Sequence, residues 1–125
     1  MVDVARAAER LIQAYNQKDF DVLETAIAPD IDFTHFNRNF VLNDRAALLD
    51  VLRGFANQYA PDRHFEAPER VLVAGDVVVR EAWYAGTAAV DLPGFGAAGE
   101  AFRLKFCSVM RFNEDGILVE WKDHG

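Results

Sequence analysis

The sequence predicts an α+β fold in which N-terminal helices pack on a strongly curved, mixed or antiparallel sheet and enclose a pocket. Apolar residues recur at helical spacing through most of the first half of the chain and alternate, as in strands, through the second half. Helices followed by a run of strands are typical of the α+β class. Pro68, inside one predicted strand, indicates an edge position or a bulge, and bulges curve a sheet. A curved sheet with helices on one face leaves a cavity between the two layers.

Three helices are predicted from their capping and stop residues. The first follows Asp3, the second follows Asp19 and ends before Pro29, and the third follows Asn43 and ends before Pro61. The apolar stripe of the first helix consists of Val4, Ala8, Leu11, Ile12 and Tyr15. The stripe of the third consists of Leu48, Val51, Leu52, Phe55 and Tyr59.

Strands are predicted at residues 31–36, 64–74, 77–87, 101–112 and 117–123. The side chains expected on the helix-facing side of the first strand are Ile31, Phe33 and His35. Those expected together on one face of the last strand are Ile117, Val119, Trp121 and Asp123. The outer face of the sheet is expected to carry Val78, Arg103, Lys105, Val109, Arg111, Leu118, Glu120 and Lys122. Such a mixed face is typical of a solvated surface or of a dimer interface.

The length and composition predict one domain spanning residues 1–125, in a cytoplasmic protein. A net charge of −7 without any basic run argues against nucleic-acid binding and against docking on anionic membranes. Cys107 is the lone cysteine, which excludes an intrachain disulfide and fits a reducing compartment. The first residues lack the pattern of a signal peptide, and no apolar run is as long as a membrane span.

Neither a metal nor a cofactor is expected. Three scattered His and one Cys lack the spacing of zinc ligands. Gly94 and Gly96 lie in a loop between two predicted strands, whereas a dinucleotide fingerprint joins a strand to a helix.

Three stretches of the chain resemble the nuclear transport factor 2-like superfamily, and most closely its SnoaL-like branch of polyketide cyclase-like and ketosteroid isomerase-like proteins. They are residues 15–21, 71–79 and 110–121. The resemblance covers essentially the whole chain. It implies a cone-shaped, cystatin-like α+β barrel with a hydrophobic pocket, and a homodimer formed through the sheet face. The superfamily includes isomerases, dehydratases, epoxide hydrolases, cyclases and non-catalytic binding modules, so the fold alone does not assign a reaction.

The resemblance also suggests three catalytic residues. His35 falls about where ketosteroid isomerase keeps its general-base Asp, and Asp123 resembles the catalytic acid near the end of the last strand in SnoaL-like cyclases. Tyr15 resembles a tyrosine of scytalone dehydratase. Each known site is matched in part, because Leu11 stands where the isomerase has its tyrosine, and Ala82 and Tyr84 stand where an epoxide hydrolase has its charged pair.

Each candidate also has a plainer interpretation. His35 on an apolar face is also explained as a core residue, Asp123 as a solvated or Arg-bound carboxylate, and Tyr15 as core. If Asp123 enters an apolar cavity, its pKa rises and it becomes an acid near neutral pH. The expected apolar walls of the substrate site are Phe33, Phe55, Trp83, Phe106 and Trp121. Trp83 and Tyr84 point to opposite faces of one strand, and the pattern does not fix which faces the pocket.

These residues predict a cofactor-independent acid/base enzyme of the isomerase, cyclase or dehydratase type. Its substrate is expected to be a small hydrophobic carbonyl or cyclic compound, with His35 as base, Asp123 as acid, Tyr15 as hydrogen-bond donor and the loop at 91–97 as a lid. The alternative is a non-catalytic ligand-binding or dimeric interaction domain. The two differ in whether His35 and Asp123 reach one closed cavity together.

Overall fold

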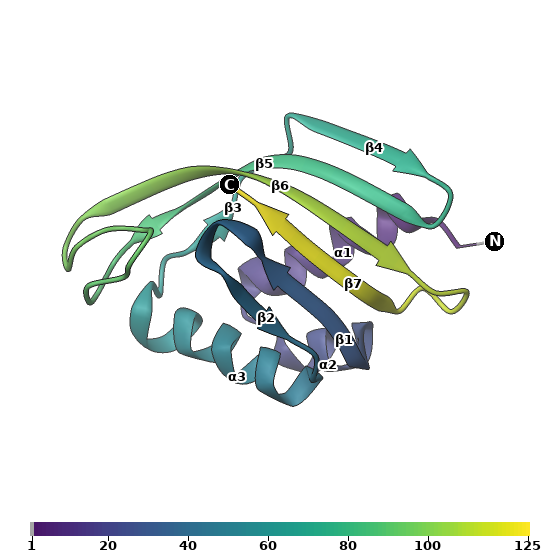
Figure 1. The fold of residues 1–125 in the computed structure, drawn as a ribbon, viewed down its shortest axis with the longest axis horizontal. Helices are drawn as coiled ribbons and strands as arrows, with labels where there is room; N and C mark the ends of the chain where they lie inside the picture. Colours follow the sequence, from purple (N-terminus) through teal and green to yellow (C-terminus); the bar gives the residue numbers. More distant parts are fainter. Residues whose placement is uncertain (1) are drawn as a thin grey trace.

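Helices lie on the concave side of a curved, mixed sheet, as the sequence predicts (Figure 1). The computed structural model describes residues 2–125. Its helices are α1 (Val4–Gln17), α2 (Phe20–Ala26) and α3 (Arg45–Gly54), with a 3₁₀ turn η1 (Phe36–Arg38) and a π-helical turn η2 (Phe55–Tyr59). Its strands are β1 (Ile27–His35), β2 (Phe40–Leu42), β3 (His64–Phe65), β4 (Arg70–Ala74), β5 (Val77–Thr87), β6 (Ala101–Phe112) and β7 (Leu118–His124).

Each α-helix begins at an Asp whose carboxylate accepts a hydrogen bond from a backbone N–H of the first turn. Asp3 accepts from Arg6 at 3.1 Å, and Asp19 accepts from Val22 at 3.2 Å. For α3 the predicted cap, Asn43, is wrong by one residue. The cap is Asp44, whose carboxylate accepts from the Ala47 N–H at 2.9 Å. These bonds satisfy N–H groups that have no partner within the helix.

The strands follow the order β2-β1-β7-β6-β5-β3, and β4 also pairs with β5. The β1–β7 pair is parallel, while the other pairs are antiparallel. The single strand predicted at 64–74 is instead two short strands, which pair with different parts of β5. Pro68 lies between them, where its missing N–H cannot interrupt a ladder.

A β-bulge in β7 changes the predicted alternation at its start. Arg111 pairs with Glu120 and Phe112 pairs with Leu118, so Val119 is the extra residue. The prediction that Ile117 and Val119 face inward is therefore wrong, and Leu118 is fully buried in their place. Past the bulge, Trp121 and Asp123 face inward as predicted. Val78, which was also expected on the outer face, is fully buried as well.

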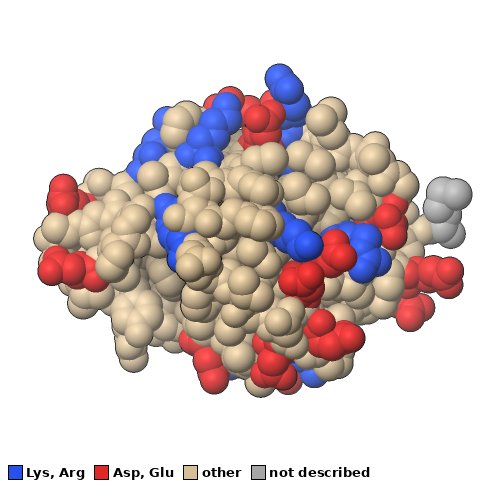
Figure 2. Space-filling model, in the orientation of Figure 1, with Lys and Arg blue, Asp and Glu red and all other residues tan. Residues whose placement is uncertain are grey.

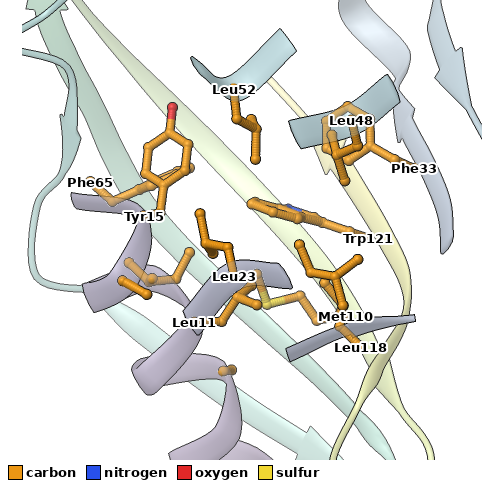
Figure 3. Packing of buried hydrophobic residues seen from close by; sticks show 14 of the residues in the cluster. Leu11, Tyr15, Leu23, Phe33, Leu48, Leu52, Phe65, Met110, Leu118 and Trp121 are labelled. Atoms are coloured by element: carbon orange, nitrogen blue, oxygen red, sulfur yellow. The ribbon is translucent and has the colours of Figure 1, made fainter. Parts of the chain in front are cut away.

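The hydrophobic core fills the space between α1, α2 and the β6–β7 half of the sheet. Figure 3 shows Trp121 at its centre, with Leu23 and Met110 on one side and Leu52 on the other. Leu11 and Leu118 complete the lower layer of that view. Trp121 is 2% exposed, and its ring meets Phe33 edge to face at 5.4 Å between centroids. Packing of Trp121 against Phe33 thus holds β7 in place beside β1.

The outer face of the sheet carries several ion pairs. Arg103 pairs with Glu66 at 2.8 Å, Lys105 pairs with Glu69 at 2.8 Å, and Arg111 bonds Glu120 at 3.2 Å. Basic and acidic side chains are intermingled in the same way at several places in the view of Figure 2. Within residues 2–125, no helix is long and apolar enough to cross a membrane.

We expect Leu118→Ala to lower the free energy of unfolding by about 2–5 kcal/mol, because the Leu118 side chain is fully buried and its removal leaves a cavity. The matched control is Leu72→Ala on β4, where the leucine is 55% exposed and the change should stay within about 0.5 kcal/mol. Urea unfolding followed by circular dichroism measures both values. Equal losses in the two variants would contradict the burial of Leu118.

Candidate functional site

A cavity of about 200 Å³ lies between the concave face of the sheet, helix α3 and the loop at 91–97. Its apolar walls are formed by Phe33, Phe40, Val51, Leu52, Phe55, Phe65, Pro93, Phe95, Phe106 and Trp121. Its polar side chains are Tyr15, His35, Arg38, Tyr84 and Asp123. An apolar cavity of about 150 Å³ holds a benzene molecule, so this one suits a ligand of about one ring.

The parallel pairing of β1 and β7 places His35 directly beside Asp123. Neighbouring strands lie about 4.8 Å apart, and residues in register on them point to the same face. Both side chains are buried, at 8% exposure for His35 and 3% for Asp123, and both line the cavity. An imidazole and a carboxylate therefore share one apolar compartment.

Burial raises the pKa of Asp123 from 3.8 to about 6, because the charged carboxylate loses its hydration. Three groups oppose this rise: the hydroxyl of Ser108 opposite it on β6, the indole of Trp121 and the positive charge of Arg38. The Trp121 indole N–H donates to the carboxylate at 2.9 Å. The pKa of this carboxyl group therefore lies close to neutral pH.

Burial has the opposite effect on His35, whose charged form is the protonated one. Burial is the largest of three effects that together lower the pKa of His35 from 6.5 to about 4, and the other two are the positive charges of Arg38 and His124. Both ring nitrogens are buried without a hydrogen-bond partner. The ring meets Phe106 edge to face at 4.9 Å between centroids. His35 is therefore neutral at pH 7, with one N–H and one lone pair that have no partner.

A pair of tyrosines forms a second polar feature of the cavity wall. The hydroxyls of Tyr15 on α1 and Tyr84 on β5 are joined by a buried hydrogen bond of 2.6 Å. Burial raises the pKa of both phenols, so both are protonated at neutral pH. One of the two protons lies between the oxygens, which leaves the other to be donated to a ligand.

Arg38 fastens the loop at 91–97 over the cavity. Its guanidinium donates to the backbone oxygens of Gly94 at 2.7 Å and Gly125 at 2.5 Å. The same group lies 4.2 Å above the ring of Phe95, which extends from the loop into the aromatic wall. Gly94 has a φ of +84°, a conformation that side chains disfavour.

Comparison with known proteins places this fold in a family. The sequence profile of the SnoaL-like domain matches residues 8–121. The chain belongs to the SnoaL-like domain family. A search of curated protein sequences finds no match.

Solved structures share the SnoaL-like fold at low sequence identity. An NTF2-like protein of unknown function from Burkholderia pseudomallei has a TM-score of 0.78 at 22% identity, covering 99% of this chain and 91% of that one. IdmH from Streptomyces antibioticus, provisionally assigned as a polyketide cyclase, has a TM-score of 0.79 at 22% identity, covering 98% and 91%. An LEH-like epoxide hydrolase from M. tuberculosis has a TM-score of 0.76 at 19% identity, covering 97% and 80%.

Most of the predicted site residues of this SnoaL-like chain meet at the one cavity. They are Tyr15, Phe33, His35, Phe55, Phe106, Trp121 and Asp123. Their roles in binding or catalysis stay predictions.

The prediction that Trp83 lines the cavity is wrong. Trp83 lies on the outer face, where its indole N–H donates to Glu69 at 2.6 Å and the Arg103 guanidinium covers its ring at 4.2 Å. Tyr84 takes the inward position. The sequence does contain a signal for this, because Trp83 shares its face with the charged Glu81.

Sequence reasoning also did not single out Arg38 and Phe95, two of the cavity residues that come from turns and loops. Arg38 belongs to η1, and Phe95 belongs to the loop at 91–97, where no periodic pattern predicts a direction. Within residues 2–125, no group of three His, Cys, Asp or Glu side chains is arranged to hold a metal ion.

The raised pKa of Asp123 predicts a pH-dependent difference in stability between the wild type and Asp123→Asn. A group whose pKa is higher in the folded state stabilises the fold fully below its unfolded pKa of 3.8, and that contribution is lost as pH rises through about 6. Relative to Asp123→Asn, the wild type should therefore lose roughly 3 kcal/mol of unfolding free energy between pH 3.8 and pH 7.

Urea unfolding of both proteins at several pH values measures this difference. Because His35 is present in both the wild type and Asp123→Asn, its contribution to the pH dependence of stability cancels in the difference between the two proteins. A difference that stays constant from pH 3.8 to pH 7 would show that Asp123 keeps an ordinary pKa.

Proposed function

We propose that this protein is a cofactor-independent acid/base enzyme that moves a proton within a small hydrophobic carbonyl or cyclic compound. The observation that carries the proposal is the buried carboxyl of Asp123, which titrates near neutral pH inside an apolar cavity. General acid/base groups work best with a pKa close to the working pH. Membership of the SnoaL-like family supports an enzyme without a cofactor.

The proposed reaction begins with a ligand carbonyl whose oxygen accepts the free proton of the Tyr15–Tyr84 pair as a hydrogen bond. The carboxylate of Asp123 takes a proton from the carbon beside that carbonyl, and the C–H electron pair moves onto the oxygen as an enolate. In a ligand with a carbon–carbon double bond next to that carbon, the enolate is conjugated with the double bond. The protonated Asp123 then returns the proton to the far carbon of the double bond, while the C=O bond re-forms and the double bond shifts by one position. No atom is gained or lost, so the product is an isomer, and ring closure follows when the enolate carbon attacks a second carbonyl instead.

The order of the two pKa values changes the roles that the family resemblance suggests. With pKa values of about 6 for Asp123 and about 4 for His35, the carboxylate is the stronger base of the pair. At pH 7 Asp123 is mostly ionised and ready to accept a proton, and it becomes the acid once it has done so. His35 is better suited to hold the ligand, because its neutral ring carries a donor on one nitrogen and an acceptor on the other.

We expect Asp123→Asn to slow proton exchange at the carbon beside a carbonyl by about 10²-fold or more, because the amide cannot accept the proton. The assay follows deuterium uptake from D₂O into small cyclic ketones, beginning with cyclohexanone, by NMR. The matched control is Asp32→Asn, a half-exposed carboxylate on β1 that pairs with Lys122 at 3.6 Å. It should leave the exchange rate unchanged.

Two results of this assay contradict the proposal. One is an Asp123→Asn protein that folds normally and keeps the wild-type rate. The other is a wild-type protein that binds the ketones without accelerating exchange, which favours the non-catalytic alternative.

One observation favours that alternative, a ligand-binding domain without a reaction. Catalytic bases are usually held by an orienting hydrogen bond, whereas neither nitrogen of His35, the base that the family resemblance suggests, has a partner. A pure binder should lose its ligand when the cavity is filled by Phe106→Trp, and should be indifferent to Asp123→Asn. The homodimer through the outer sheet face also stays a proposal, supported by half-buried Val79 and Val109 at the centre of that face.

A further inference from the structure

Arg63 is a buried cation without a carboxylate partner. It follows η2 and is 2% exposed, yet no Asp or Glu of residues 2–125 forms a salt bridge with it. Arg80, which is 3% exposed, shows the usual arrangement, since Glu9 pairs with it at 2.9 Å. Buried charges are normally paired in this way because their desolvation is costly. The position of Arg63 therefore needs an explanation.

The guanidinium of Arg63 makes both its hydrogen bond and its aromatic contact with Tyr15. Its Nη2 donates to the backbone oxygen of Tyr15 at 2.7 Å, and its guanidinium carbon lies 4.1 Å from the centre of the Tyr15 ring. The backbone oxygen belongs to the last turn of α1, where a cation suits the helix dipole. That bond uses one donor and supplies only a partial negative charge. The Nε and Nη1 atoms are buried without a partner.

The Tyr15–Tyr84 pair connects this cation to the cavity. Arg63 does not line the cavity, but the ring it covers does. The two hydroxyls share one proton and offer the other to a ligand oxygen. Negative charge on that oxygen polarises both hydroxyls and is attracted to the guanidinium behind them, in a region of low dielectric constant.

The other charged groups around the pair are Arg38 and Asp123. Asp123 opposes an anion when it is ionised, and Arg38 favours one. All five buried side-chain atoms without a partner in residues 2–125 are nitrogens, and they belong to His35, Arg38 and Arg63. In this protein of net charge −7, the two arginines near the cavity, Arg38 and Arg63, thus each keep at least one buried N–H donor without a partner. Their natural complement is an acceptor with negative charge.

We propose that Arg63 is a positioning residue that acts through Tyr15 and Tyr84 and makes the cavity prefer a ligand whose oxygen is negatively charged, a phenolate or an enolate, over its neutral analogue. This inference rests on the cavity described for the proposed function and names the ligand class that it selects. It does not depend on whether the protein turns that ligand over.

The test compares two probes of similar shape, 4-nitrophenol and its methyl ether 4-nitroanisole, by calorimetry at neutral pH. The wild type should bind 4-nitrophenol at least about tenfold more tightly, and the absorption band of the bound probe should be that of the phenolate. Arg63→Met should weaken binding of 4-nitrophenol by about tenfold and change binding of 4-nitroanisole by less than about threefold. Arg63→Lys, which keeps the charge, should restore most of the preference.

The matched control is Arg53→Met. Arg53 also lies over an aromatic ring, that of Phe20 at 5.1 Å, but it is half-exposed on α3 and pairs with Asp50 at 3.5 Å. It should leave the preference unchanged. Circular dichroism confirms that each variant is folded.

Two measurements keep the test decisive if Arg63→Met does not fold. The wild type alone overturns the proposal if it binds both probes equally or binds 4-nitrophenol as the neutral phenol. Tyr84→Phe, which removes the link to the ligand, should lose the preference while Arg63 stays in place. A folded Arg63→Met or Tyr84→Phe protein that keeps the full preference also overturns the proposal.

These outcomes are separable from the failure of the proposed function. A protein that prefers the phenolate, loses this preference in Arg63→Met and never exchanges a proton refutes the enzyme and supports the role of Arg63. If proton exchange depends on Asp123 but Arg63→Met keeps the phenolate preference, the enzyme is supported and the role of Arg63 is refuted.

Discussion

The parallel pairing of β1 with β7 is the contact on which the candidate site depends. These strands are far apart in the chain, yet their register sets Phe33 beside Trp121 and His35 beside Asp123. The first pair is part of the aromatic core, and the second lies one step further along the same face, where the core gives way to the cavity. The stability of the core therefore fixes the geometry of the two titratable groups.

A single physical effect, the removal of water, gives this site its chemical character. Loss of water disfavours the charged form of both Asp123 and His35. It therefore raises the pKa of Asp123, which is charged when deprotonated, and lowers the pKa of His35, which is charged when protonated. The hydrogen bonds of Trp121 and Ser108 limit the rise at Asp123, which keeps its proton exchangeable near neutral pH. Tyr15 and Tyr84 show the same effect, since their hydroxyls line the apolar cavity and burial raises the pKa of both. Arg63 lies behind them, over the ring of Tyr15.

Local patterns in the sequence carry much of this architecture. Alternation in β1 and β7 correctly places His35, Trp121 and Asp123 on the inner face, and the bulge at Val119 does not disturb Asp123 because it precedes Trp121. What local patterns cannot supply is the pairing between distant strands and the direction of loop residues. The hydrogen bond of Trp83 with Glu69 and the approach of Arg63 to α1 are contacts of this kind, between residues 14 and 48 positions apart.

Titration of the Asp123 carboxyl carbon and the His35 ring by NMR, in one sample, tests the account most directly. A carboxyl midpoint near pH 6, with His35 remaining neutral down to about pH 5, is the result that a shared apolar cavity requires. Ordinary midpoints, near 3.8 for Asp123 and 6.5 for His35, would show that water reaches both groups, and the proposed proton transfer would lose its physical basis.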